Sequence, residues 1–516
     1  MNVYILYTGG TIGCVGTPLT PMSGADFQQA FEANLLPTIQ SQLPGTSVTF
    51  DYFSTTLDST NMQPSKWVEM AQKIYDNYNS YDGFIVLHGT DTMAWTSSAL
   101  SFLLPGLSKP IIVTGSQLPL FYQTGSSPSD YQLLNNTDAV RNVEGAIRFL
   151  EFGFPEVGLY FADHLLRGNR AVKSNASEFV AFSSPNYHYL GEFGVIPTLY
   201  NNYVLPDPSV NSLSLEENYT QVGQNLTTIA SNISDSSVIQ FLLFPAYYEE
   251  PDGDKSLLVS ILENIQNASP ALKGIIFEAY GEGNIPDYQS MQSLLSDMHS
   301  KELILIDCTQ VFAGDVNYNA YATGAWLKDA GVVGGHDMTP IAALTKMIVL
   351  LALNPSSSQS EVELQMASNL AGELTSYYSI SGYQNEFLLP GQVLYSINGD
   401  YQFENSLDGS LIVYDTSDTQ NPTVIWKQDM SSPGRLIMQA DNNLVYYDSS
   451  HSPIWASNTP QIGFNSYLML GNDGSLNIYN LYTNELYYTV FNPSDQNTKP
   501  DSDEVKPLNR VPLRTR

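Results

Sequence analysis

The stretch Tyr4-Ile-Leu-Tyr-Thr-Gly-Gly-Thr-Ile-Gly13, read together with Gly83-Phe-Ile-Val-Leu-His-Gly-Thr-Asp-Thr-Met93, decides the fold of this 516-residue chain. Each stretch begins as a β-rich apolar run and ends abruptly in glycine, threonine and aspartate. The pattern predicts two strands that end in loops carrying hydroxyls, a carboxylate and free backbone N–H groups. Cleavage of an amide by a threonine nucleophile requires an attacking hydroxyl, charged groups that take its proton, and N–H donors for the oxyanion.

Apolar runs alternate with amphipathic segments over most of the chain, which is typical of parallel sheets covered by helices on both faces. In the first half we expect strands at 2–7, 84–87, 111–114 and 157–161, and helices at 27–36, 66–77, 96–104 and 134–149. In the second half we expect strands at 239–244, 274–277 and 303–307, and helices at 256–266, 289–300, 342–352 and 360–377. Because sites in open α/β sheets lie beyond the carboxyl ends of the strands, both threonine-bearing loops are expected at the site.

Near Gly382 the helical periodicity stops, and short strands separated by Asp-Gly and Asp-Asn turns take over. Three similar segments, starting at Asp408, Asp441 and Asp473, recur at intervals of 33 and 32 residues. Each is followed by an aromatic side chain: Trp426, Trp455 and Tyr487. We therefore expect three equal β units that close around a shared apolar axis and bury one of these rings each.

Composition narrows the possible partners. The chain carries 20 Lys and Arg against 52 Asp and Glu, a net charge of −32, which argues against nucleic acid and anionic membranes as partners. The acids are scattered, as on a solvated surface, and no apolar run is long enough to span a bilayer.

The two cysteines, Cys14 and Cys308, exclude a disulfide framework and favour a reducing compartment. The chain begins directly in a strand pattern, without the features of a signal peptide, so we expect a cytoplasmic protein. Cys14 lies three residues after Thr11, but no histidine lies nearby to pair with it, so we do not favour a thiol nucleophile.

The two opening motifs, in this order and at this separation, resemble the signatures of the L-asparaginase family. Further segments resemble those of the type I, cytoplasmic subgroup: 56–62, 113–119, 166–173, 279–284 and 321–324. The resemblance covers about residues 1–375. It implies an α/β fold of two subdomains, 1–190 and 237–378, with parallel or mixed sheets and flanking helices, joined by a crossover at 191–236. It also implies conversion of L-asparagine to L-aspartate and ammonia, without cofactor or metal.

The resemblance also implies roles for individual residues. Thr11 would attack and carry the aspartyl ester, while Thr90, Asp91 and Lys173 would form a second cluster. A carboxylate beside an ammonium stabilises the charged lysine, so we expect Asp91 to orient Lys173. Thr90 would then either activate the attacking water or relay its proton. We favour Thr11 over Thr90 as the first nucleophile.

The zwitterionic substrate needs partners of both signs. By resemblance, Asp58 and Asp91 would bind its α-ammonium group, and Ser59 and loop N–H groups would hold its α-carboxylate. Ser116 would also contact the substrate. Asn284 would reach the site of a neighbouring subunit, which implies a homodimer or homotetramer.

The segment 14–24, which corresponds to the mobile lid of the family, departs from the family pattern. The family places a tyrosine there that hydrogen-bonds the nucleophile, whereas this lid has none and Leu19 falls near its place. Either another hydroxyl, such as that of Thr17 or Thr20, substitutes for the tyrosine, or turnover is weakened.

The central C-terminal unit resembles the mannose-binding motif of the bulb-type lectins, whose fold is an all-β, three-sided β-prism. Residues that alternate along one strand face would contact the sugar: Gln439, Asp441, Asn443, Val445 and Tyr447. The other two units keep the aspartate and lose the rest, so we interpret them as structural. The resemblance predicts a lectin-like domain at 383–492 that binds a mannose-type glycan, followed by a flexible tail at 493–516.

Two alternatives stay open. The same chemistry could act on glutamine or another amide, because one methylene provides only ~1–3 kcal/mol of discrimination. Alternatively, the chain could be a carbohydrate-binding protein on a weakly active amidohydrolase scaffold. The missing lid tyrosine favours this second alternative, and the retention of the four catalytic candidates argues against it.

Overall fold

The computed structural model divides the chain into two compact units, which are described separately. The first comprises Met1–Ser209, Ser214–Ser237 and Thr339–Pro355, and the second Val210–Leu213, Val238–Met338 and Ser356–Arg516. The described residues are 1–125, 130–201, 203–205, 207–208, 214–252, 254–266, 271–316, 322–375, 378–382, 386–396, 398–418, 421–439, 441–459, 466–480 and 485–494, without the side chains of 322–325. All but the first two residues of the expected tail at 493–516, and Tyr321 of the segment 321–324, lie outside them.

An eight-stranded mixed sheet forms the centre of the first unit, with the strand order β14-β13-β10-β9-β6-β5-β1-β4. From β4 to β9 all neighbours are parallel, and from β9 to β14 they are antiparallel. The strands are β1 (Asn2–Gly9), β4 (Ser47–Leu57), β5 (Gly83–Leu87), β6 (Ile111–Thr114), β9 (Val157–Phe161), β10 (His164–Arg167), β13 (Gly191–Phe193) and β14 (Pro197–Leu199).

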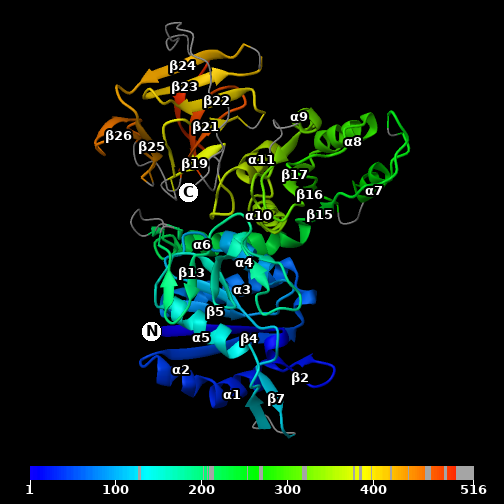
Figure 1. Ribbon diagram of the computed structural model, residues 1–516, viewed down its shortest axis with the longest axis vertical. Helices are drawn as coiled ribbons and strands as arrows, with labels where there is room; N and C mark the ends of the chain where they lie inside the picture. Colours follow the sequence, from blue (N-terminus) through cyan, green and yellow to red (C-terminus); the bar gives the residue numbers. More distant parts are fainter. Residues whose placement is uncertain are drawn as a thin grey trace. The chain divides into compact units, whose positions relative to one another are not determined.

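Helices cover both faces of this sheet (Figure 1). On one face, Val3, Ile5 and Tyr7 of β1 share an apolar core with α1 and α5, because alternate residues of a strand point the same way. On the other face lie α3 and α4, and α6 and α10 pack outside them. The helices are α1 (Gly24–Asn34), α2 (Leu36–Gln42), α3 (Pro64–Asn77), α4 (Met93–Leu103), α5 (Ala139–Leu150), α6 (Tyr219–Asn232) and α10 (Pro340–Leu353).

Two predicted helix bounds were wrong by five residues or more, each for a local reason. The helix expected at 134–149 begins at Ala139, because the preceding residues form the strand β8 (Tyr131–Leu133) and the Thr137 hydroxyl accepts the Ala139 N–H. The helix expected at 360–377 is α11 (Gln359–Ala367) and ends ten residues early. Beyond it, the Glu373 carboxylate accepts the N–H groups of Leu370 and Ala371, bonds that compete with a continuing helix.

The expected crossover at 191–236 contains regular structure. β13 and β14 extend the antiparallel end of the sheet, and α6 packs against α3 and α10. Among the described residues, no helix combines the length and the apolar character that a membrane crossing requires.

A four-stranded parallel sheet, β15 (Val238–Leu242), β16 (Gly274–Ala279), β17 (Ile304–Thr309) and β18 (Val332–Gly334), opens the second unit. Its helices are α7 (Leu257–Gln266), α8 (Gln289–Ser300), α9 (Ala322–Asp329) and α11. Leu262 of α7, Leu295 of α8 and Ile275 of β16 lie in one buried cluster. The chain therefore has two separate α/β sheets with flanking helices, one in each unit.

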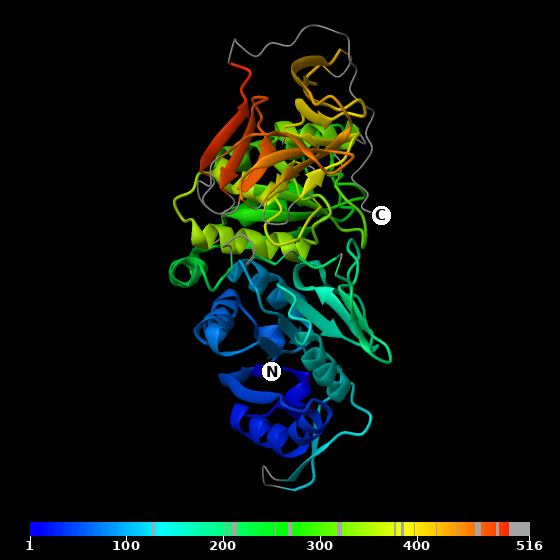
Figure 2. The same cartoon turned by 90° about the vertical axis from the view of Figure 1, so that its left-hand side faces the viewer.

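Three antiparallel four-stranded sheets follow from about residue 379, drawn from yellow to red in Figures 1 and 2. They are β21-β22-β23-β24, β20-β25-β26-β27 and β19-β28-β29-β30, and all three contribute to one apolar core. Their strands are β19 (Ser379–Ser381), β20 (Phe387–Leu388), β21 (Gln392–Tyr395), β22 (Tyr401–Asn405), β23 (Ser410–Asp415), β24 (Thr423–Asp429), β25 (Gly434–Met438), β26 (Leu444–Asp448), β27 (Pro453–Ala456), β28 (Ser466–Leu470), β29 (Leu476–Asn480) and β30 (Leu486–Phe491).

The repeated aspartates are turn residues. In each of the three C-terminal β units, the carboxylate accepts the backbone N–H two residues further on, at 3.1 Å for Asp408, 3.0 Å for Asp441 and 3.0 Å for Asp473. This side-chain turn explains why the aspartate recurs in all three units. Of the expected core rings, Trp426 is buried, whereas Trp455 and Tyr487 are partly buried against the same core.

Candidate active site

Four loops meet at the carboxyl ends of the neighbouring parallel strands β4, β1, β5 and β6. Gly10, after β1, has a φ of +82°, and a Cβ there would lie 2.3 Å from Gly89 Cα, after β5. Gly9 has a φ of +121°, and its Cβ would lie 2.1 Å from Leu57 O at the end of β4. Only glycine permits both the conformation and the approach, so the Thr11 and Thr90 loops touch backbone to backbone.

Lys173 joins two of the predicted catalytic residues. Its Nζ donates to Thr90 Oγ1 at 2.9 Å and to Asp91 Oδ1 at 2.7 Å. It lies on the short strand β11 (Val172–Lys173), which follows β10 and pairs with β12 (Phe182–Ser183). The Lys173 side chain is 18% exposed and that of Asp91 56%, so the lysine is held inside while the carboxylate stays open to solvent.

Thr11 begins a short 3₁₀ turn, Thr11–Gly13, and is half-buried. It follows Gly10 as Thr90 follows Gly89, so the two threonines extend from glycines that touch. Below the turn, the ring of Tyr7 fills the space that a side chain at Gly13 would need. The structure thus brings three of the four predicted catalytic residues into hydrogen-bond contact and places the fourth on the adjoining loop.

Asp58 and Ser59 lie on the loop after β4. The Asp58 carboxylate accepts the N–H of Thr60 and caps the 3₁₀ turn Ser59–Asn61. Ser59 is buried, its carbonyl accepts the Thr92 hydroxyl at 2.8 Å, and its Oγ lies where a side chain at Gly89 would stand. Both predicted substrate-binding residues therefore border the Thr90 loop.

Ser116 and Asn284 lie in different settings. Ser116 is fully buried, and its hydroxyl donates to Leu118 O at 2.5 Å. Its neighbour Gln117, rather than Ser116, presents a side chain to Thr90. Asn284 belongs to the second unit, where it closes a loop by bridging to Tyr280.

The lid segment forms a tight hairpin of β2 (Cys14–Val15) and β3 (Thr20–Pro21). Leu19, near the place of the family tyrosine, is 53% exposed. Thr17 and Thr20 are also exposed, and the Thr20 hydroxyl donates to Pro18 O at 3.4 Å. Both hydroxyls that could replace the tyrosine therefore face solvent.

Cys14 does not have the features of a nucleophile. The thiol is buried and donates to Gly10 O at 3.3 Å. Burial, with a smaller contribution from the Asp58 charge, raises the pKa of Cys14 to about 11, so the thiol stays protonated at neutral pH.

Three residues behind the cluster were not predicted. His88 is fully buried, with Nδ1 2.7 Å from Gly89 O and Nε2 2.9 Å from Thr96 Oγ1, so its neutral form donates from Nδ1 to the carbonyl. Asp138 accepts the backbone N–H groups of Gln117 and Leu118 at 2.9 and 3.0 Å. Gln117 and His88 lie inside motifs already noted, and Asp138 at the start of α5 was hidden by the misplaced helix bound.

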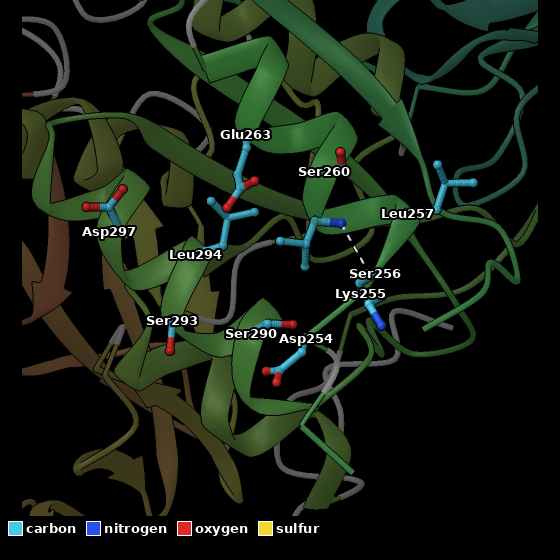
Figure 3. A pocket seen from close by; sticks show the side chains of 11 residues that line it. Asp254, Lys255, Ser256, Leu257, Ser260, Glu263, Ser290, Ser293, Leu294 and Asp297 are labelled. Carbon is cyan, nitrogen blue, oxygen red and sulfur yellow. Dashed lines mark hydrogen bonds between the residues drawn. The ribbon is translucent and has the colours of Figure 1, made fainter. Parts of the chain in front are cut away.

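A cavity of about 770 Å³ lies elsewhere, between α7 and α8 of the second unit (Figure 3). Serines and acidic side chains line it, among them Ser260, Glu263, Ser293 and Asp297. The Ser256 hydroxyl at its rim is bonded to the Tyr288 hydroxyl, and Asp297 pairs with Lys301. None of the four predicted catalytic residues lines this cavity, since all four belong to the first unit.

Comparison with known proteins identifies the family of the chain. The family profile "Asparaginase, N-terminal" matches residues 2–204, and "Glutaminase/Asparaginase C-terminal domain" matches residues 255–363. L-asparaginase 1 of Escherichia coli K12 is 34% identical over 377 residues, which cover 72% of this chain and 98% of that protein. The mouse 60 kDa lysophospholipase is 32% identical over 389 residues, covering 72% and 62% of the two chains. The crystal structure of L-asparaginase I from Vibrio cholerae is 31% identical, with a TM-score of 0.55, and covers 72% of this chain and 99% of that one.

These matches define a hydrolase of the α/β class. The chain belongs to the L-asparaginase family and is homologous to the type I enzymes over about residues 2–380. The matches leave the C-terminal β region unassigned.

The buried His88 predicts a pH-dependent stability. Burial lowers the pKa of His88 to about 4 from an ordinary value of 6.5, so the unfolded chain takes up a proton before the folded chain does. The stability from this group is complete above pH 6.5 and is lost as the pH falls toward 4, by about 3 kcal/mol in all. We measure the free energy of unfolding in urea between pH 7 and 4.5. For His88→Gln we expect the decrease that His88 causes in this free energy to be absent. The exposed control His451→Gln should keep it, and equal slopes for His88→Gln and the wild type would contradict the assignment.

Proposed function

We propose that this enzyme hydrolyses L-asparagine to L-aspartate and ammonia. The observation that carries the proposal is Lys173 Nζ, held between Thr90 Oγ1 and Asp91 Oδ1 beside the glycine loop of Thr11. Relatives named L-asparaginase that match almost their full length support the substrate.

The reaction would proceed through a covalent ester. Thr11 Oγ1 attacks the carboxamide carbon, the C–N bond breaks, and ammonia leaves with the threonine proton. Backbone N–H groups of the converging loops would stabilise the oxyanion. Water then attacks the aspartyl ester, with Thr90 passing the water proton to Lys173 in its neutral form and Asp91 holding the lysine in place. The C–O bond to Thr11 breaks, aspartate leaves, and the proton returns from Lys173 to Thr11 Oγ1, which restores the free enzyme.

The charged ends of the substrate would be bound at the rim. Asp91, half exposed, and Asp58 on the adjoining loop supply negative charge for the α-ammonium group. Ser59 and the N–H groups of its turn would hold the α-carboxylate. The arrangement fits a small zwitterion, because carboxylates for its ammonium end and hydrogen-bond donors for its carboxylate end lie on neighbouring loops.

Glutamine or another amide is the second candidate substrate. It is favoured by the second family profile, whose description, "Glutaminase/Asparaginase C-terminal domain", also names glutaminases. A weakly active scaffold that serves mainly to bind carbohydrate is favoured by the lid, where Leu19 stands in place of the expected tyrosine.

Substitution of the nucleophile tests the reaction. We expect Thr11→Ala to lower ammonia release from asparagine by about 10³-fold or more, because the attacking group is removed. The control Thr227→Ala, at an exposed threonine of α6, should retain full activity. Ammonia release should be measured from asparagine and glutamine in parallel. Equal rates for Thr11→Ala and wild type would refute the nucleophile, and release from glutamine alone would establish the second candidate.

We also propose that the three C-terminal sheets form a bulb-lectin-like β-prism with one mannose-type site on the central unit. Gln439, Asn443 and Tyr447 are partly exposed, and Asp441 is exposed. Gln439 Nε2 donates to Tyr447 Oη at 2.9 Å, and Asn443 Oδ1 accepts from Ser457 at 3.1 Å. The expectation that all five residues alternate along one strand face was wrong: Gln439, Asp441 and Asn443 lie in the turn between β25 and β26, and only Val445 and Tyr447 lie on β26. The bonds orient polar groups at this turn and on the adjoining strand, as recognition of sugar hydroxyls requires.

Some of the predicted sugar-binding residues also have a structural role. Asp441 makes the turn that its counterparts make in the other two units, so its presence alone does not indicate a site. Val445 is 4% exposed and offers little apolar surface. Gln439 and Asn443, which have no counterparts in the other units, carry the proposal.

Binding to immobilised mannose tests the C-terminal proposal. We expect the wild type to be retained and Asn443→Ala to be eluted, because one sugar hydroxyl loses its directed partner. Ser475→Ala, at the equivalent position of the third unit, is the matched control and should be retained. Passage of the wild type through the column would contradict a mannose site.

We further propose that the enzyme is a homodimer or homotetramer in which Asn284 completes a neighbouring subunit's site. Support comes from the apolar side chains exposed on and after the edge strand β15: Leu242 is 52%, Phe244 40% and Tyr247 71% exposed. Apolar groups beside an unpaired strand edge are typical of an interaction surface.

Subunit complementation tests this assembly. Thr11→Ala and Asn284→Ala should each be inactive alone. Co-expression should restore about a quarter to a half of the activity, since a mixed dimer contains one site with both native residues. Sedimentation should give the mass of a dimer or tetramer. No recovery on co-expression, or a monomeric mass, would contradict the proposal.

The cytoplasm is the proposed compartment, on the ground that Cys14 and Cys308 are both free, buried thiols. Recovery of the protein outside the cytoplasmic fraction would contradict this.

A further inference from the structure

Gln117 connects the two parts of the catalytic cluster. Its side-chain Oε1 accepts a long hydrogen bond from Thr90 Oγ1, at 3.5 Å. Its Nε2 donates to the carbonyls of Ala176 and Glu178, at 3.3 and 2.9 Å, in the segment that follows Lys173. One amide therefore links the loop of Thr90 to the segment that carries the lysine.

The orientation of this amide is determined by its partners. The carbonyls of Ala176 and Glu178 can only accept, so the NH₂ group must face them and Oε1 must face Thr90. Oε1 is in turn only an acceptor, so Thr90 has to donate its proton to Gln117. The Thr90 lone pairs are then free to accept from Lys173 Nζ, as the 2.9 Å contact shows.

The backbone of Gln117 is also held firmly. Asp138, at the N-terminus of α5, accepts both the Gln117 and the Leu118 N–H groups. Asn142, one turn into the helix, donates to Asp138 Oδ2 and to Gly115 O. The loop after β6 is thereby attached to a helix end, so Gln117 keeps its place when the substrate enters.

We propose that Gln117 is a positioning residue for the hydrolysis: it holds the Thr90 hydroxyl in the rotamer that donates away from Lys173 and accepts from the lysine ammonium group. When Lys173 gives up its proton, Thr90 has to turn its hydroxyl toward the lysine, and Gln117 Oε1 loses its donor. Gln117 therefore favours the protonated state of the Thr90–Lys173 pair, which is the state that forms when water gives up its proton. The proposal rests on the function proposed above.

Two substitutions of similar length separate this role from a merely structural one. Gln117→Met removes the acceptor, so we expect kcat for asparagine to fall about tenfold with KM within about twofold, since Gln117 acts on proton transfer. The acid limb of the pH profile of kcat/KM should move to lower pH, because the protonated pair loses a partner. Gln117→Glu keeps an acceptor and adds negative charge, so this limb should move to higher pH.

Both variants leave the charged groups around the Thr90–Lys173 pair in place, and a third variant serves as the control. The charged groups nearest the pair, Asp91 on Lys173 and Asp138 behind Gln117, are unchanged in both variants. Gln132→Met is the matched control, since it removes the acceptor of another hydroxyl, that of exposed Tyr122. It should leave kcat, KM and the pH profile as in wild type.

Failure of this inference is distinguishable from failure of the proposed function. If wild-type enzyme releases no ammonia from asparagine or glutamine, the proposed function fails. If wild type is active and both Gln117 variants keep its pH profile, Gln117 has no positioning role. The role is supported if kcat falls and the acid limb of the pH profile moves in opposite directions in Gln117→Met and Gln117→Glu. It is overturned if the acid limb moves in the same direction in both variants.

Discussion

The close approach of two loop backbones, at Gly10 and Gly89, is the constraint on which the site depends. Neighbouring parallel strands end at the same edge of a sheet, so β1 and β5 deliver their loops side by side. A Cβ at Gly10 would lie 2.3 Å from Gly89 Cα, and a Cβ at Gly89 would lie 2.5 Å from Ser59 Oγ, so a side chain at either position would displace a neighbouring loop. The two threonines follow these glycines directly, so the spacing of the candidate nucleophile and the candidate relay is set by the absence of side chains.

Lys173 follows the antiparallel part of the sheet, whereas the two threonine loops follow parallel strands. After β9 the sheet turns antiparallel, so β10 runs away from the edge where the loops lie. The chain then passes α4 in the 3₁₀ turn Gly168–Arg170 and reaches Lys173 beside Thr90. Just before β11, Arg167 forms a buried ion pair with Glu156 at 2.6 Å, and both side chains are 3% exposed. A buried pair of this kind is costly to separate, so it fixes the path of the chain shortly before Lys173. The cluster is thus assembled from a parallel half that presents hydroxyls and an antiparallel half that presents the cation.

The C-terminal sheets illustrate how one repeated residue can serve two purposes. The aspartate at each turn is required by the turn, and the apolar residues of β23, β26 and β29 are required by the common core. The units differ at the two positions that flank the turn aspartate: Gln439 and Asn443 in the central unit, Ser406 and Ser410 in the first, and Gly471 and Ser475 in the third. A fold built from equal units can therefore carry a binding face on one unit without altering the other two.

Local patterns in the sequence predicted several strands, most helices and the turns, because apolar periodicity and glycine- or aspartate-containing loops act over a few residues. They did not predict β4, β10, β13 or β14 of the central sheet. They located β1, β5, β6 and β9, whereas Thr11, Thr90, Asp91 and Lys173 became candidates because their segments resemble those of the L-asparaginase family. They failed where a side chain bonds the backbone just outside a helix, as Thr137 and Glu373 do. Only the tertiary structure decided that Lys173 meets Thr90, 83 residues away, and that Gln117 and Asp138 stand behind them. Those contacts depend on the order of strands in the sheet, and strand order is a property of long-range packing that no short stretch of sequence contains.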